Sequence, residues 1–165
     1  MATGRNVQLT KQVGEYLVAS ELARRGYLSS TFSGNVPDFD IVATNQSGTT
    51  RLIQVKTING GSWQFSIDRF ATIEMEGNNQ IIGRKKAQPI EQLIFVLVKL
   101  GQKYGEDEFY ILKCNILQDI LIKHHREYLA KHNGERPRSK KSMHCGLQSK
   151  EILNYRDNWS CFNRT

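Results

Sequence analysis

The sequence predicts a mixed α/β fold, in which helices flank a central sheet of mostly antiparallel to mixed strands. Two alternating segments, residues 38–43 and 52–57, are separated by a polar turn and predict a β-hairpin. The run from Leu93 to Val98 is almost wholly apolar and is typical of a central strand buried on both faces. Because a hairpin joins antiparallel strands, it argues against a doubly wound parallel sheet.

Residues 8–25 are predicted to form the first helix. Its apolar residues fall into two stripes at helical spacing, one of Leu9, Val13, Tyr16 and Leu17, the other of Val18, Ala19 and Leu22. Glu15 lies within the second stripe, either at its edge or held there for a purpose. Gly26 is the expected end of the helix.

The register of the hairpin decides which side chains meet. If the loop is symmetric about Gly48, then Asp40 pairs with Lys56 and Val42 with Gln54. Opposed residues share a face of the sheet, so Asp40, Gln54 and Lys56 would lie together. Such a group suits a divalent cation with a lysine that orients water, and an ordinary ion pair on a solvated face is the alternative.

The remaining elements follow in order along the chain. Residues 27–32 are expected to form a strand and residues 33–37 a turn; residues 63–67 and 108–113 form further strands, residues 116–131 a helix, and residues 147–155 a short helix. Residues 68–86 show little periodicity and are expected to form an irregular, partly mobile loop, which could carry a helical turn or close over a substrate. Trp159 and Phe162 are expected to anchor the tail to the core.

Length and composition indicate one soluble domain over residues 1–165. No apolar run is long enough to cross a bilayer, and the first residues lack the apolar core of a signal peptide, so a cytoplasmic protein is expected. The cysteines Cys114, Cys145 and Cys161 are far apart and odd in number, which argues against a disulfide framework and a structural zinc site.

The net charge of +7 is concentrated near the C-terminus. Residues 1–122 carry 13 basic and 12 acidic side chains, whereas residues 123–165 carry 10 and 4. A basic segment is therefore expected over residues 133–165, densest at Arg136, Arg138, Lys140 and Lys141. Such a segment attracts polyanions, nucleic acid first, and a solvated, mobile loop is the alternative. A second basic group is Arg84, Lys85 and Lys86.

These motifs together resemble the PD-(D/E)xK nuclease superfamily, which includes restriction endonucleases and archaeal Holliday junction resolvases. The resemblance rests on Gly14-Glu15 in a helix, Pro37-Asp38 followed by Asp40, and Gln54-Val55-Lys56 on the next strand, and covers roughly residues 8–125. It implies a restriction endonuclease-like core, a Mg²⁺ or Mn²⁺ cofactor, and DNA as the expected substrate. A homodimer is a further expectation, because cleavage of two strands in this superfamily usually needs one.

The resemblance also implies roles for individual residues. Asp40 or Asp38 would be the metal-binding aspartate, with Asp40 favoured. Glu15 would complete the shell of the cation, and the carbonyl of Val55 is a further ligand. Lys56 would orient or help to deprotonate the attacking water.

Gln54 departs from the family pattern, which usually has an acid there. Its carbonyl can ligate Mg²⁺ but adds no negative charge. Two functions therefore stay open: a metal-dependent endonuclease of restriction-like or junction-resolving type, and a catalytically inactive module on the same fold that binds nucleic acid or a protein partner. A third interpretation is an unrelated α/β protein whose hairpin charges are simple surface pairs.

Overall fold

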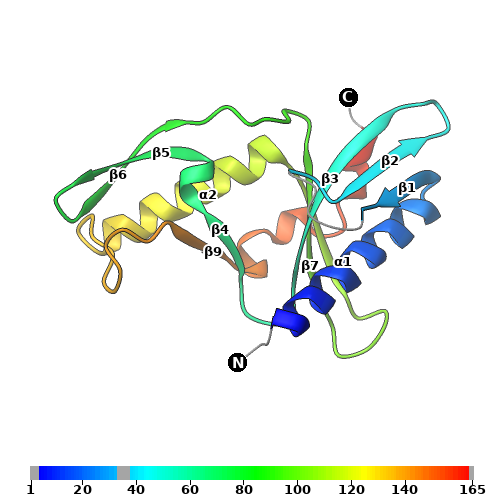
Figure 1. Ribbon diagram of the computed structural model, residues 1–165, viewed down its shortest axis with the longest axis horizontal. Helices are drawn as coiled ribbons and strands as arrows, with labels where there is room; N and C mark the ends of the chain where they lie inside the picture. The colour runs from blue at the N-terminus through cyan, green and yellow to red at the C-terminus, as the bar shows by residue number, and fades with distance from the viewer. Residues whose placement is uncertain (1–3, 33–37, 164–165) are drawn as a thin grey trace. The chain divides into compact units, whose positions relative to one another are not determined.

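A computed structural model describes residues 4–32 and 38–163 of the chain (Figure 1). The chain divides into two compact units. The first, here the sheet unit, comprises residues 1–63, 92–114 and 148–165. The second, here the hairpin unit, comprises residues 64–91 and 115–147. The expected basic segment at 133–165 is thus divided between the two units, while the expectation of one domain over residues 1–165 stays a prediction.

The sheet unit is built on a five-stranded mixed sheet, which confirms the predicted fold class. Its strands lie in the order β1-β2-β3-β7-β8. Their bounds are β1 Tyr27–Thr31, β2 Ile41–Asn45, β3 Thr50–Ile58, β7 Ile94–Lys99 and β8 Glu108–Lys113. Only the β3–β7 pair is parallel; the other three pairs are antiparallel. The apolar run predicted to be central is β7, and its residues from Ile94 to Val98 are all buried.

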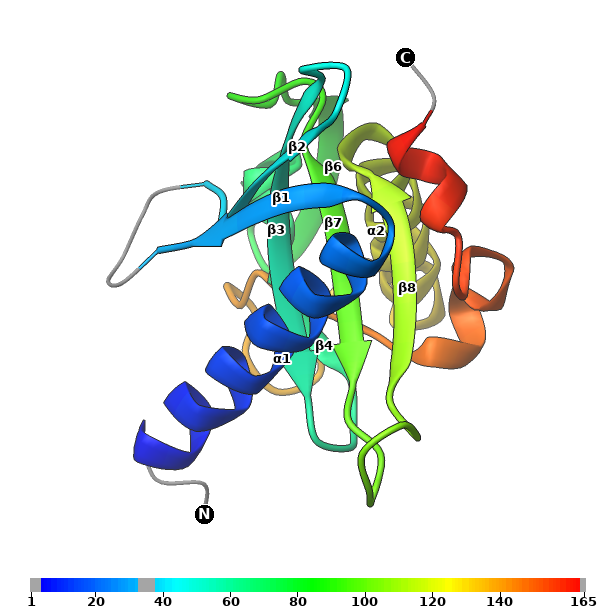
Figure 2. The same cartoon turned by 90° about the vertical axis from the view of Figure 1, so that its right-hand side faces the viewer.

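Helix α1, Gly4–Arg24, packs on one face of this sheet, over β1 and β3 (Figure 2). Val18 and Leu22 are fully buried in a core that includes Ile53 and Val55 of β3. Gly26, with φ of +83°, ends the helix as predicted. In the other stripe, Leu9, Val13 and Tyr16 are exposed, whereas Leu17 is partly buried against this core. The core-facing side of α1 therefore combines the second stripe with Leu17 of the first.

The predicted register of the β2–β3 hairpin is wrong by two residues. Val42 pairs with Leu52, not with Gln54. The side chain of Asn45 accepts a hydrogen bond of 2.9 Å from the amide of Thr49, and the amide of Gly48 donates to the Asn45 carbonyl at 3.0 Å. These contacts close the loop earlier than symmetry about Gly48 would.

In the hairpin unit, the secondary structure predicted for residues 68–86 is wrong. Residues 68–86 are not an irregular loop: they form β5, Ala71–Glu76, and β6, Asn79–Lys85, which pair antiparallel. The two-residue turn Gly77-Asn78 joins them, with Gly77 at φ of +61°. The unit also contains α2, Cys114–Lys131, and the strand pair of β4, Trp63–Ser66, with β9, His144–Leu147. The first residues of α2 and β4, Cys114 and Trp63, belong to the sheet unit.

The C-terminal residues return to the sheet unit. The helix expected at 147–155 is instead two short 3-10 helices, Ser149–Glu151 and Leu153–Tyr155. A third, Trp159–Phe162, buries the two aromatic residues that were expected to anchor the tail. Trp159 packs on Phe109 and Phe162 packs on Tyr27, with ring centroids 5.5 and 5.8 Å apart. The predicted anchor is confirmed.

Neither helix in the described part of the chain has both the length and the apolar character that a bilayer crossing requires.

Candidate metal centre

A glycine in α1 determines where the candidate site lies. A Cβ atom built on Gly14 would lie 1.8 Å from Oγ1 of Thr57 on β3. No real side chain fits there, so a residue without a Cβ lets the helix backbone approach the strand. Because the helix approaches the strand here, the next residue, Glu15, lies close to the sheet. Close packing against Thr57 thus explains why the Gly14-Glu15 pair contains a glycine.

Asp40 lies at the entrance to β2, beside the backbone of β3. Its amide donates a hydrogen bond of 2.7 Å to the carbonyl of Ile53. Its carboxylate accepts one of 2.8 Å, at Oδ2, from the amide of Val55. Where β2 begins, a side-chain oxygen thus accepts the hydrogen bond of the Val55 amide. This hydrogen bond fixes the carboxylate at the backbone of β3, the strand that carries Gln54 and Lys56.

Lys11 forms ion pairs with both predicted acidic residues, Glu15 and Asp40. Its Nζ lies 3.2 Å from Oδ1 of Asp40 and 3.5 Å from Oε1 of Glu15. The carboxylate side chains are 11% and 12% exposed, whereas Lys11 is 43% exposed. The structure therefore brings Glu15 and Asp40 together around one positive charge. Sequence reasoning missed Lys11, although its position four residues before Glu15 on a helix is a signal for this contact.

The electrostatics of this group favour a cation. Burial and the charge of Asp40 raise the pKa of Glu15, although Lys11 opposes that rise. Burial by itself lowers the pKa of Lys11, but the charges of Asp40 and Glu15 outweigh it and raise that pKa overall. Two partly desolvated carboxylates therefore face each other, and a positive charge between them lowers the cost of ionising both.

Gln54 and Lys56 lie on the other side of β3 from α1. Strand alternation puts them on the face opposite to Ile53 and Val55, which pack in the core with α1. The two residues share a face, as strand alternation predicts, and their convergence with Asp40 stays a prediction. The Asp40 carboxylate lies at the Val55 amide, on the boundary between the two faces.

The second aspartate of the motif is placed differently. Asp38 is exposed and has a φ of +73°, which an aspartate tolerates better than most residues. Pro37 lies outside the described residues. Of the two aspartates, Asp40 is the one that contacts Lys11 beside Glu15 and hydrogen-bonds to β3.

The donor set suits a hard divalent cation. Carboxylate oxygens of Glu15 and Asp40, the Gln54 amide and the Val55 carbonyl are ligand types that Mg²⁺ and Mn²⁺ accept. Within residues 4–32 and 38–163, no three His, Cys, Asp or Glu side chains are arranged to hold a metal ion. An ion here would therefore depend on two carboxylates and neutral oxygens. Lys11 already shows that a positive charge fits beside both carboxylates.

The predicted nucleic-acid-binding residues all belong to the hairpin unit. At the end of β6, Arg84 is exposed, Lys85 pairs with Asp119 at 2.7 Å, and Lys86 donates to the carbonyl of Asp68 at 2.5 Å. Their role in binding nucleic acid stays a prediction.

In the loop after α2, Arg138 and Lys141 are exposed, whereas Lys140 pairs with Glu135. Arg136 donates to the carbonyl of His144 at 2.7 Å. Gln80 of β6 donates two hydrogen bonds, to the carbonyls of Lys140 and Ser142. This loop is therefore tied to the rest of the hairpin unit at several points, unlike the mobile loop of the alternative interpretation.

Comparisons with known proteins add little to this description. No family model matches the chain. No curated protein matches its sequence. A solved structure of a bacterial homing endonuclease, I-Ssp6803I, is similar over 92% of this chain and 89% of its own, with 11% identity and a TM-score of 0.49. At that similarity it assigns no role to any residue of this chain.

Proposed function

We propose that the sheet unit is the catalytic part of a divalent-metal-dependent nuclease that hydrolyses DNA phosphodiester bonds. The observation that supports this most is the pair of partly buried carboxylates, Glu15 and Asp40, that share the ammonium of Lys11. Partly buried like charges are costly for stability alone and are common at functional sites. The motif order around them matches what the resemblance to PD-(D/E)xK nucleases implies.

In this proposal, Asp40 and Glu15 would hold Mg²⁺ or Mn²⁺, with oxygens of Gln54 and Val55 as further ligands. The bound ion would supply an activated water and neutralise charge on the phosphate. Lys11, which contacts both carboxylates, would compete with the ion for them. Lys56 would orient the attacking water and stabilise the charge that develops in the transition state.

A cleavage assay tests the proposal. Supercoiled, linear and branched DNA are incubated with the protein in Mg²⁺, Mn²⁺ or EDTA. Cleavage is expected with either metal and not in EDTA, and is expected to fall at least 100-fold in Asp40→Asn and Lys56→Ala, the loss typical of removing an electrostatic group. Glu21→Gln is the matched control on α1, because Glu21 pairs with Arg25 instead. If Asp40→Asn and Lys56→Ala cut as well as the control, the assignment is wrong.

A second candidate is a non-catalytic module that binds nucleic acid. Two observations favour it: Gln54 contributes no charge, and Lys11 already places a positive charge beside both acids. It predicts binding to DNA that weakens with salt, without cleavage and without heat of Mn²⁺ binding in calorimetry. Mn²⁺ binding that Asp40→Asn removes would decide against this candidate.

A further inference from the structure

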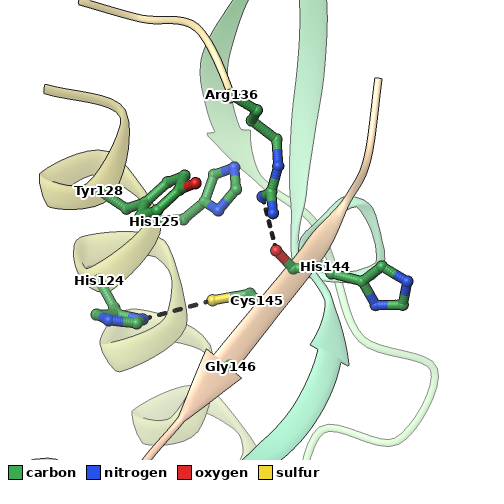
Figure 3. A pocket seen from close by; sticks show the side chains of 7 residues that line it. All are labelled: His124, His125, Tyr128, Arg136, His144, Cys145 and Gly146. Carbon is green, nitrogen blue, oxygen red and sulfur yellow. Dashed lines mark hydrogen bonds between the residues drawn. The ribbon is translucent and has the colours of Figure 1, made fainter. Parts of the chain in front are cut away.

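The hairpin unit contains a pocket between α2 and the segment from Arg136 to Gly146 (Figure 3). It consists of two adjoining cavities of about 210 and 450 Å³ that share Tyr128, Arg136 and His144. The larger cavity is within the range of small-ligand sites, roughly 300–1,000 Å³. Its other walls are His132, Pro137, Arg138, Ser139 and Ser142.

Flat side chains form one side of this pocket. The rings of Tyr128 and His132 have centroids 4.7 Å apart, and the guanidinium of Arg136 lies 5.2 Å from the centroid of Tyr128. Figure 3 shows Tyr128 and Arg136 facing the same space, whereas the ring of His144 points away from it. Rings and guanidinium groups of this kind are the surfaces on which unstacked bases lie in single-strand binding proteins.

The charge of the pocket is positive. Arg136 and Arg138 line it, and no acidic side chain is among its lining residues in the described part of the chain. His125 adds no charge at neutral pH, because burial together with the charges of Arg136 and His124 lowers its pKa to about 4. A ligand that combines a planar group with a negative charge is complementary to these walls.

The pocket is also held rigidly. The Nε2 of His125 lies 2.9 Å from Oε1 of Gln80, and the amide nitrogen of that glutamine donates to the carbonyls of Lys140 and Ser142. Because the glutamine oxygen can only accept, the histidine nitrogen is the donor. Arg136 is fixed by the carbonyl of His144 and has further N–H groups for a ligand. Such preorganisation reduces the entropy lost on binding.

We propose that this pocket binds one unstacked nucleotide of a single-stranded nucleic acid. The base lies against Tyr128, His132 and Pro137, and the adjacent phosphate pairs with Arg138 and the unused N–H groups of Arg136. The inference does not depend on the nuclease proposal, because the pocket residues belong to the hairpin unit and binding requires no metal. A free nucleotide has the same chemistry, and the experiment separates the two ligands.

Binding is measured in EDTA with a single-stranded oligonucleotide that carries one 2-aminopurine, whose fluorescence is quenched by stacking. Wild type is expected to quench the probe. Tyr128→Leu and His132→Leu are each expected to weaken binding roughly 10-fold and to reduce quenching, as loss of a stacking surface does. Arg138→Gln is expected to lower the slope of log affinity against log salt by about 0.7. Thermal melts establish that each variant is folded.

Two substitutions are matched controls. Arg126→Gln removes the same charge from an exposed position of α2 that does not line the pocket, and Tyr104→Leu removes an exposed tyrosine in the sheet unit. Equal loss of binding in Arg126→Gln and Arg138→Gln would overturn the proposal, as would unchanged quenching in both ring variants. Nucleoside monophosphate that binds as tightly as the oligonucleotide would overturn it in favour of a free-nucleotide site.

Discussion

Gly14 and Thr57 pack so closely that a single methyl group on the glycine would overlap the threonine hydroxyl, at 1.8 Å from Oγ1. This contact sets the distance between α1 and β3, and with it the position of Glu15 beside Asp40. The helix backbone at Gly14 is thus part of the candidate metal centre, although it contributes no ligand.

Gly14→Ala is expected to lower the free energy of unfolding by about 2 kcal/mol, because overpacking outweighs the gain of about 1 kcal/mol in helix propensity. Urea unfolding measures this change. Thr57→Ala combined with Gly14→Ala removes the overlap with Oγ1 and is expected to restore part of the loss. If the losses of unfolding free energy in the two single variants simply add in the double variant, the Gly14–Thr57 contact is not the cause of the destabilisation.

Thr57→Val is expected to stabilise the protein by about 1 kcal/mol. Among the described residues, Oγ1 of Thr57 is buried and has no hydrogen-bond partner, so its removal relieves a desolvation cost. The comparison variant is Thr44→Val, since the hydroxyl of Thr44 is exposed and lies 2.9 Å from that of Thr50. The control is expected to change stability by less than about 0.5 kcal/mol. A loss of stability in Thr57→Val would show that its hydroxyl is needed.

Lys11→Met is expected to tighten Mn²⁺ binding, because an incoming ion no longer competes with the ammonium for Glu15 and Asp40. The pKa of Glu15 is expected to rise further in the metal-free variant, since Lys11 lowers it in the wild type. Titration calorimetry measures the affinity, and NMR of the Glu15 carboxyl measures the pKa. Arg24→Met at the far end of α1 removes the same charge and is expected to leave both quantities unchanged; equal effects of the two variants would contradict this role of Lys11.

His125 is expected to make stability fall as pH is lowered from about 6.5 to about 4. In that window the unfolded chain binds a proton at this histidine, whereas the folded chain, with a pKa of about 4, does not. Stability therefore rises with pH there, and the total change is roughly 3 kcal/mol. Urea unfolding at several pH values measures it. His125→Gln is expected to be less stable at pH 7 but to lose this part of the slope; an unchanged slope would assign it to other groups.

The elements that sequence reasoning identified are those with strong local signals. The apolar run to Val98 is a central strand, the segment 108–113 is β8, and Gly26 ends α1. Each depends on hydrophobic periodicity or on a backbone conformation that glycine favours. These signals are contained within a few consecutive residues.

The errors occurred where contacts between distant or polar residues decide the outcome. The hairpin register depends on the side chain of Asn45, which composition alone does not reveal. The β5–β6 hairpin was missed because its strands carry polar residues such as Glu74 and Gln80 among few apolar ones. The contact of Lys11 with Asp40 was missed because it joins residues that lie far apart in the chain.

The C-terminal return of the chain has a consequence for synthesis on the ribosome. The sheet unit needs residues 148–165, whose Trp159 and Phe162 pack on Phe109 and Tyr27, whereas the hairpin unit ends at residue 147. A nascent chain therefore has every residue of the hairpin unit before it can close the sheet unit. Glu15 of α1 and Asp40 therefore join a finished core only after Trp159 and Phe162 have been synthesised.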